Sequence, residues 1–224
     1  MSIDNLNTAL RFYFVSDDQA TSLTPYDQVR IAIQAGATTI QYRRKKFNLQ
    51  FYDEALAIRQ LCQANAVPFI VNDHVLLARA LAAEGVHLGQ ADANPGLVRR
   101  ILGPQAVIGI SVSNRYELTH TDLTPCDYIG SGPVFPTTTK ADAKKVRQLS
   151  GLEEITRAAP LPVVAIGGID HTNATACFQY GATGIAVIST ISRATDPLQN
   201  ALQLSAACGC TPRDPLGLPP SEAI

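Results

Sequence analysis

The chain has 224 residues, a formal net charge of −1 and 46 % hydrophobic residues, which is the composition of an ordinary globular protein. This length predicts one domain with a substantial core. The near-neutral charge argues against general binding to nucleic-acid phosphates. No apolar stretch reaches the roughly 18 residues of a membrane span, so we expect neither a nucleic-acid nor a membrane partner.

The N-terminus and the cysteines both indicate a cytoplasmic protein. Residues 1–5 lack the basic start and apolar segment of a secretion signal. Five cysteines are odd in number and scattered, which predicts free thiols in a reducing compartment. Cys208 and Cys210 could form half of a metal site, but no second Cys/His pair lies nearby, so we interpret them as free thiols.

Eight apolar runs of strand length alternate with amphipathic stretches. Such runs are typical of strands buried on both faces of a parallel sheet. Eight of them in this length favour a (β/α)8 TIM barrel. An open doubly wound sheet would need a glycine-rich loop after the first run, where residues 15–18 read Val-Ser-Asp-Asp. The runs are residues 12–15, 38–42, 68–72, 85–89, 107–111, 128–131, 163–167 and 184–189.

We predict that a single barrel domain covers residues 1–205. Residues 206–224 are rich in glycine and proline, which predicts a loosely ordered C-terminal tail rather than a helix. No function is assigned to this tail.

Basic residues follow the second run, where the active sites of such barrels collect. Strand side chains alternate between faces, so Gln41, Arg43 and Lys45 would share the face toward the barrel mouth. An amide, a guanidinium and an ammonium group together suit a polyphosphate. The alternative interpretation is a solvated basic loop.

Two carboxylates, Asp73 and Asp92, follow the third and fourth runs. Carboxylates completed by substrate phosphates are the usual ligands of Mg²⁺. Both residues could instead be helix N-caps. His87 lies within the fourth run, and a lone histidine among apolar residues is more often structural than catalytic.

A second anion site is predicted from the later runs. Gly167 and Gly168 follow the seventh run, and Ile188 and Ser189 end the eighth, where bare backbone N–H groups can hold a phosphate. Ser111, after the fifth run, is a further hydrogen-bond donor.

Residues 127–142 form the loop expected between the two anion sites. Glycines and prolines shape its start, and Thr137, Thr139 and Lys140 supply donors for an anion. A plain turn is the alternative interpretation.

These motifs occur together, in order, over nearly the whole predicted barrel, and they resemble the thiamine-phosphate synthase family. The match at residues 127–140 is highly specific. The motifs are Gln41-Tyr-Arg43-Arg-Lys45, Val71-Asn72-Asp73, Gly85-Val-His-Leu-Gly-Gln-Ala-Asp92, Gly109-Ile-Ser111, Asp127-Tyr-Ile-Gly-Ser-Gly-Pro-Val-Phe-Pro-Thr-Thr-Thr-Lys140, Ala165-Ile-Gly-Gly168 and Gly184-Ile-Ala-Val-Ile-Ser189.

The resemblance implies a (β/α)8 transferase (EC 2.5.1.3) that uses Mg²⁺. Such an enzyme moves the hydroxymethylpyrimidine of its diphosphate onto a thiazole phosphate and releases pyrophosphate and thiamine phosphate. The family's reaction is thought to be dissociative. A homo-oligomer is compatible with the sequence, which does not fix the oligomeric state.

The resemblance also implies roles for individual residues. Asp73 and Asp92 would bind Mg²⁺, and Arg43, Lys45, Ser111 and Lys140 would be catalytic. The pyrimidine-diphosphate contacts would be Gln41, Arg43, Lys45, Asn72, Ser111 and Lys140. The thiazole-phosphate contacts would be Thr137, Thr139, Gly168, Ile188 and Ser189.

The sequence departs from the family pattern at three positions. Arg44 and Ala91 replace frequent acids, and we expect Arg44 to face away from the mouth. Ser113 stands where many relatives have histidine. A sister family of thiazole tautomerases usually keeps that histidine as a catalytic group and lacks the second carboxylate, so the synthase is favoured. A non-catalytic phosphate-binding barrel would not explain Asp73 and Asp92 beside the basic cluster.

Overall fold

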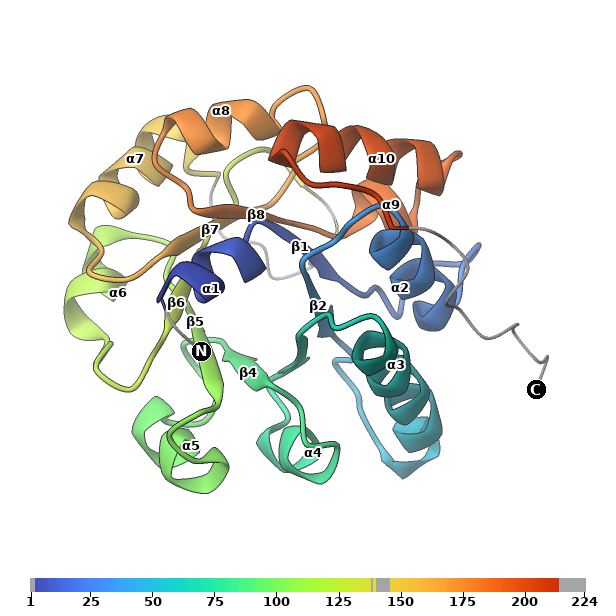
Figure 1. The fold of residues 1–224 in the computed structure, drawn as a ribbon. Helices are drawn as coiled ribbons and strands as arrows, with labels where there is room; N and C mark the ends of the chain where they lie inside the picture. Colours follow the sequence, from blue (N-terminus) through green and yellow to red (C-terminus); the bar gives the residue numbers. More distant parts are fainter. Residues whose placement is uncertain (1–2, 138, 140–145, 214–224) are drawn as a thin grey trace.

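Eight parallel strands close into a barrel in the computed structural model, which describes residues 3–137, 139 and 146–213. Each strand pairs with the next along the chain, and β8 returns to pair with β1. The helices form a ring around the strands (Figure 1). The prediction of a single (β/α)8 barrel is therefore confirmed, and the described ends of the strands differ from the predicted ones by no more than two residues. The strands are β1 (Phe12–Val15), β2 (Thr39–Tyr42), β3 (Phe69–Asn72), β4 (Gly85–Leu88), β5 (Val107–Ser111), β6 (Tyr128–Ser131), β7 (Val163–Ile166) and β8 (Gly184–Val187).

Several helices start at side-chain caps. Thr24, Asn94 and Asp196 each accept a hydrogen bond from the backbone N–H three residues further on, and a proline follows each of them. The helices are α1 (Ile3–Ala9), α2 (Pro25–Gln34), η1 (Leu49–Phe51), α3 (Tyr52–Ala64), α4 (Val75–Ala80), α5 (Pro95–Leu102), α6 (Arg115–His120), α7 (Gln148–Ala158), α8 (Ala174–Gln179), α9 (Ser189–Ser192) and α10 (Pro197–Cys208).

Alternate side chains of each strand pack on opposite sides of the barrel wall. Phe12 and Phe14 join the large core between strands and helices, whereas Tyr13 and Val15 point into a smaller core inside the barrel. Leu6 of α1 packs against that inner core, and α1 lies across one opening of the barrel (Figure 1). The other opening, at the carboxyl ends of the strands, is left for a site.

The C-terminal boundary differs from the prediction. Helix α10 continues to Cys208, so the predicted boundary at residue 205 lies inside a helix, and Gly209 ends that helix with a φ of 66°. Arg213 donates hydrogen bonds to the carbonyl oxygens of Ile33 and Ala37, which ties the chain to the end of α2. Residues 214–224 of the predicted tail lie outside the described residues.

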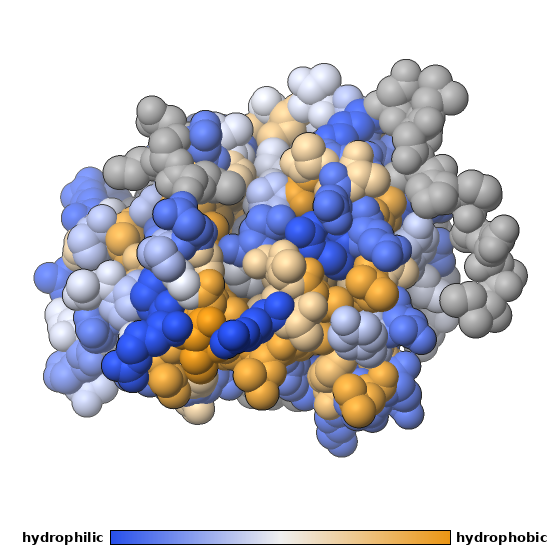
Figure 2. Space-filling view, turned by 60° about the horizontal axis from the view of Figure 1, so that its bottom comes forward, coloured by the Kyte–Doolittle hydropathy of each residue, from blue (hydrophilic) through white to orange (hydrophobic). Residues whose placement is uncertain are grey.

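The face that carries α3, α4 and α5 mixes polar and apolar side chains. Figure 2 shows apolar groups gathered on this side of the molecule. Leu49, Leu76 and Leu97 are exposed there. In the part of the chain that the structure describes, no helix is long and apolar enough to cross a membrane.

Candidate active site

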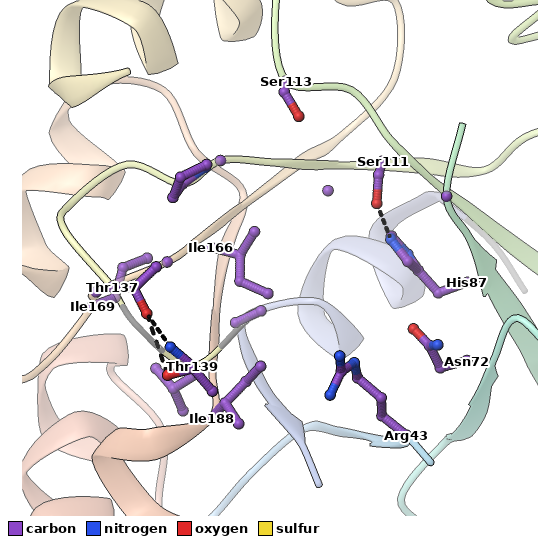
Figure 3. Close-up of a pocket in the computed structure, with 18 of the residues that line it drawn as sticks. Arg43, Asn72, His87, Ser111, Ser113, Thr137, Thr139, Ile166, Ile169 and Ile188 are labelled. Atoms are coloured by element: carbon purple, nitrogen blue, oxygen red, sulfur yellow. Dashed lines mark hydrogen bonds between the residues drawn. The ribbon is translucent and has the colours of Figure 1, made fainter. Parts of the chain in front are cut away.

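A cavity of about 460 Å³ opens at the carboxyl ends of the strands. Figure 3 shows how side chains from widely separated strands converge on it. Of the predicted site residues that the structure describes, all but Gln41 line this cavity, and Lys140 lies outside the described residues. The predicted residues in its wall are Arg43, Lys45, Asn72, Asp73, Asp92, Ser111, Thr137, Thr139, Gly168, Ile188 and Ser189.

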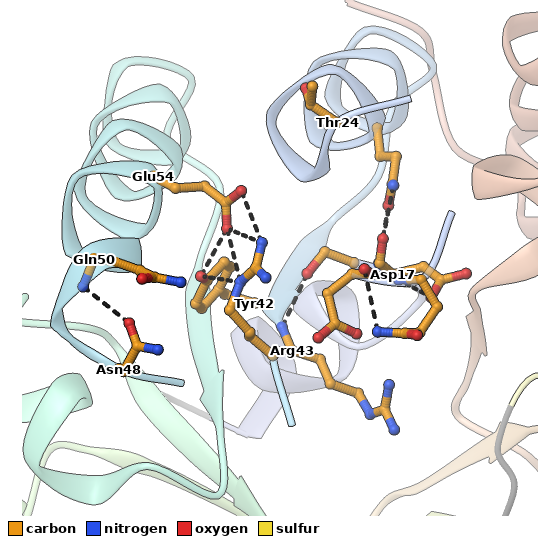
Figure 4. Close-up of polar contacts among 12 residues, drawn as sticks. Asp17, Thr24, Tyr42, Arg43, Asn48, Gln50 and Glu54 are labelled. Carbon is orange, nitrogen blue, oxygen red and sulfur yellow. Dashed lines mark hydrogen bonds and ion pairs between the residues drawn. The ribbon is translucent and has the colours of Figure 1, made fainter. Parts of the chain in front are cut away.

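The basic side of the cavity comes from the loop after β2. The side chain of Arg43 is buried against the cavity, and its backbone N–H donates to Ser16 Oγ at 2.9 Å. Arg44 points the other way, as the alternation of side chains predicts. Its guanidinium lies over the Phe51 ring and donates to both carboxylate oxygens of Glu54 (Figure 4). This bracing holds the loop while Arg43 and Lys45 face the cavity.

Gln41 lies deeper in the barrel than the sequence analysis predicts. It belongs to β2 itself, two residues below Arg43, and its side chain is buried. Its Nε2 donates to the hydroxyl of Tyr13 at 2.9 Å. The structure therefore does not bring Gln41 to the cavity wall, because its amide is engaged in the barrel interior.

Asp73 and Asp92 meet beside the basic residues, in the loops after β3 and β4. Burial raises the pKa of Asp73 to about 6, and the nearby Asp92 carboxyl adds to the rise, while Asn72 and Arg43 partly offset it. Asp73 has a φ of 62°, in the left-handed region that a short polar side chain tolerates. The N-caps of α4 and α5 are His74 and Asn94, so neither aspartate serves as a helix cap.

The paired carboxylates fit a divalent cation that substrate oxygens complete. Two acidic groups held this close favour a positive charge between them. Within the described ranges, no group of three or more His, Cys, Asp or Glu side chains forms a full metal cage. Two carboxylates with further ligands from phosphate and water are the arrangement that suits Mg²⁺.

Hydroxyl groups and bare backbone form the third part of the wall. Thr137 donates to Thr139 at 3.2 Å, and Thr139 donates to Ser189 at 3.0 Å. Gly168 has a φ of 64°, and a Cβ there would lie 2.5 Å from the carbonyl oxygen of Pro136. This close approach brings the loop after β6 against the loops after β7 and β8, at the predicted monophosphate site.

The structure adds residues that sequence reasoning did not select. His87 lines the cavity, and its Nε2 lies 3.0 Å from Ser111 Oγ (Figure 3). Gln90 donates to the carbonyl oxygen of Ser111 at 2.7 Å. The glycines inside β5 and β6 could have indicated that His87 points toward them, because glycines inside a strand often make room for a large neighbouring side chain.

An ion pair between buried Asp17 and exposed Arg193 braces the last loop of the site. Asp17, in the loop after β1, accepts hydrogen bonds from Arg193 Nε at 2.7 Å and from Ser192 Oγ at 3.1 Å. Burial acts to raise the pKa of Asp17, but these bonds and the Gln19 N–H outweigh it and hold the pKa below its usual value. Helix α9, whose first residue is Ser189, is thereby fixed to the loop after β1.

Fold and site together define a (β/α)8 barrel of the enzymatic type, with a cavity at the carboxyl ends of its strands that groups cations, paired carboxylates and hydroxyls. The family model described as "Thiamine monophosphate synthase" matches residues 12–191. The chain belongs to the thiamine monophosphate synthase family.

Individual relatives agree with that assignment. The chain is 39 % identical over 190 residues to the thiamine-phosphate synthase of Vibrio campbellii, covering 84 % of this chain and 93 % of the relative. It is 37 % identical over 210 residues to that of Bacillus velezensis, covering 92 % and 93 %. A solved structure, the thiamine phosphate pyrophosphorylase from Pyrococcus furiosus, is 35 % identical, with a TM-score of 0.83 and coverage of 91 % and 98 %.

Proposed function

We propose that this chain is a thiamine-phosphate synthase that joins a pyrimidine diphosphate to a thiazole phosphate in the cavity at the barrel mouth. Its relatives at 37–39 % identity carry that name. The observation that carries the proposal is the division of one cavity into two parts. Arg43, Lys45 and the Asp73–Asp92 pair line one part, and hydroxyls and glycines line the other.

The first part suits a diphosphate leaving group. Arg43 and Lys45 supply fixed positive charge where negative charge develops as the C–O bond breaks. Asp73 and Asp92 would hold Mg²⁺, which when bound neutralises the charge of the departing pyrophosphate. Ser111 and Asn72 would orient the pyrimidine diphosphate from the neighbouring strands. Lys140, outside the described residues, remains a predicted contact of the same group.

The second part suits the phosphate of the thiazole substrate. Thr137, Thr139 and Ser189 present linked hydroxyls, and Gly168 and Ile188 add backbone N–H groups to the same wall. Binding there would hold the thiazole nitrogen toward the pyrimidine.

The reaction requires positioning more than protein nucleophiles. The electron pair of the breaking C–O bond leaves with pyrophosphate, and the lone pair of the thiazole nitrogen forms the new C–N bond to the pyrimidine methylene. Holding both substrates in one cavity makes their encounter intramolecular and keeps water from the electrophilic carbon. No proton transfer is needed at the bond-forming atoms.

The thiazole tautomerase alternative receives less support. Ser113 lies in the cavity wall, where the sister family has a catalytic histidine. An unactivated serine hydroxyl does not act as a general base near neutral pH. The second carboxylate, Asp92, is also present beside Asp73.

Incubation of the purified protein with the pyrimidine diphosphate, the thiazole phosphate and Mg²⁺ tests the proposal. We expect equal amounts of thiamine phosphate and pyrophosphate, and loss of both products when EDTA removes the metal. Absence of both products with a folded protein would reject the synthase. Isomerisation of a thiazole carboxylate phosphate without pyrimidine would favour the tautomerase.

The cellular setting and the assembly remain proposals as well. Five free cysteines support a reducing, cytoplasmic location. The homo-oligomer is a prediction that sedimentation can measure. Leu76 of α4 and Leu97 of α5 are exposed, so Leu76→Asp is a suitable variant for that measurement.

A further inference from the structure

A continuous chain of hydrogen bonds crosses the barrel interior beneath the cavity. The Gln41 amide nitrogen donates to Tyr13 OH at 2.9 Å, and Tyr13 OH lies 2.8 Å from Tyr128 OH. Tyr128 OH lies 3.0 Å from His87 Nδ1, and His87 Nε2 lies 3.0 Å from Ser111 Oγ. The chain thus joins five strands and ends at a hydroxyl in the cavity wall.

Two glycines make room for this chain. Gly109 of β5 is in register with His87 on one side and with Tyr128 on the other. A Cβ on Gly109 would clash with the Tyr128 ring and would lie 2.5 Å from His87 Nδ1. A Cβ on Gly130 would lie 2.9 Å from His87 Cε1. The strands therefore omit side chains where the two rings meet.

The donors and acceptors fix the direction of the chain. An amide nitrogen only donates, so Tyr13 OH accepts from Gln41 and uses its own proton toward Tyr128. Burial raises the pKa of both tyrosines above its ordinary value, so both hydroxyls keep a proton to donate. A neutral His87 ring that accepts this bond from Tyr128 at Nδ1 carries its proton on Nε2.

The opposite direction leaves a buried donor unsatisfied. If Tyr128 donated to Tyr13, the Tyr13 proton would face the Gln41 amide nitrogen, which does not accept a hydrogen bond. Tyr13 is almost fully buried, and an unpaired buried hydroxyl is costly. The forward direction gives both tyrosine protons an acceptor.

We propose that His87 is a positioning residue whose Nε2–H tautomer is set by the Tyr13–Tyr128 hydroxyl pair. His87 Nε2–H donates to Ser111 Oγ, so that the serine proton points into the cavity. Ser111 then meets the substrate as a donor rather than as an acceptor. Under the proposed function, on which this step rests, the partner is an acceptor atom of the pyrimidine diphosphate.

The tautomer is measured directly, without substrate. In ¹⁵N NMR spectra of the wild type, the resonances of His87 are assigned by their loss in His87→Gln, which separates them from the other three histidines. We expect a protonated Nε2 and an unprotonated Nδ1. A protonated Nδ1 with a bare Nε2 overturns the inference, whatever the enzyme catalyses.

Two tyrosine variants form a matched pair for the same measurement. Tyr128→Phe removes the hydroxyl that sets the tautomer, and the His87 resonances should move toward a mixture of both forms. Tyr42→Phe removes another buried tyrosine hydroxyl, one that donates to Glu54 on the helix side of the wall, and should leave them in place. Equal changes in both variants would contradict the proposal.

A double-mutant cycle tests whether His87 acts through Ser111. We expect Ser111→Ala and Tyr128→Phe each to raise KM for the pyrimidine diphosphate by about tenfold, with little change for the thiazole phosphate. Tyr128→Phe should add almost nothing in the Ser111→Ala background. His87→Gln, whose amide can still donate, should retain more activity than His87→Ala.

The outcomes separate this inference from the proposed function. A folded wild type that makes no product rejects the synthase assignment, while the NMR result still decides the tautomer. An active wild type in which the effects of Ser111→Ala and Tyr128→Phe are fully additive rejects the positioning role alone.

Discussion

The carboxyl groups of Asp73 and Asp92 lie close enough to form a hydrogen bond, although the two residues follow different strands of the barrel. The contact raises the pKa of Asp73 together with burial. A pair of acids at this distance destabilises the metal-free protein, and only a cation or a shared proton relieves the repulsion. Under the proposed function, the arrangement would sacrifice some stability for metal binding.

Replacing one carboxylate should separate stability from activity. We expect Asp73→Asn to lower Mg²⁺-dependent turnover by orders of magnitude, because a proposed metal ligand is lost. The same change should raise the stability of the metal-free protein by about 1–2 kcal/mol, since the like-charge contact disappears. Thermal melts in EDTA and turnover at several Mg²⁺ concentrations check both effects. Asp53→Asn, an exposed acid of α3, is the control, and unchanged turnover in both Asp73→Asn and Asp92→Asn would rule out the metal assignment.

The stability of the metal-free protein should depend on pH through Asp73. Its pKa of about 6 in the folded protein exceeds the roughly 3.9 of an unfolded aspartate, so the folded state favours the protonated form. The stability that protonated Asp73 contributes is fully present below pH ~4 and is lost as the pH rises to ~6. Urea unfolding should show that the difference in the free energy of unfolding between wild type and Asp73→Asn changes over this pH range and stays constant above it. A difference independent of pH would contradict the coupling of the two acids.

The strands could be predicted because each one is a short run of apolar residues that ends at polar or glycine residues. The sequence also predicts that three side chains reach the cavity, because side-chain alternation and the barrel geometry fix which edge of the barrel they lie at. These are Arg43, Asp73 and Asp92. The depth of Gln41 in the barrel could not be predicted, because it depends on a hydrogen bond to Tyr13 in a different strand. Sequence patterns report which face a side chain takes but not how deep it lies.

Other features depend on residues far apart in the chain. The direction of the His87 hydrogen bonds depends on Tyr13 and Tyr128, which no local pattern connects. The glycine and proline content of residues 206–224 predicts a tail that does not continue a helix, but composition over a whole stretch does not locate the end of α10. Ala206, Ala207 and Cys208 continue the helix, and Gly209 supplies the left-handed residue that ends it.

Asp17 should stabilise the protein mainly above pH 4. Its pKa in the folded state lies below the usual value, so its ion pair and hydrogen bonds are fully present above the unfolded pKa and are lost as the pH falls below about 4. Asp17→Asn should cost about 1–3 kcal/mol at pH 7, a range that allows for the partly exposed Arg193. Denaturation at pH 7 and pH 3 checks this, and the difference in the free energy of unfolding between the two proteins should be smaller at the lower pH.

The same variant should affect one substrate more than the other. Asp17 holds Ser192 and Arg193 of the segment that begins with Ser189, so loosening it should raise KM for the thiazole phosphate. KM for the pyrimidine diphosphate should change less, because Arg43 and Asp73 lie in the loops after β2 and β3. Asp53→Asn, an exposed acid in the first turn of α3, controls for the loss of one charge. Equal rises in both KM values would show that Asp17 acts on the whole barrel rather than on this loop.

Glu54 and the Phe51 ring hold the Arg44 guanidinium on the side away from the cavity. Arg44→Glu should place two carboxylates together and cost about 1–2 kcal/mol, because the 2.9 Å ion pair becomes a repulsion and the stacking on Phe51 is lost. It should also raise KM for the pyrimidine diphosphate severalfold by loosening the loop that carries Arg43 and Lys45. The double variant Arg44→Glu/Glu54→Arg reverses the pair and should recover most of the stability and most of the affinity. Failure of the reversed pair to recover either quantity would mean that Arg44 acts through contacts other than Glu54, with the Phe51 ring as the next to test.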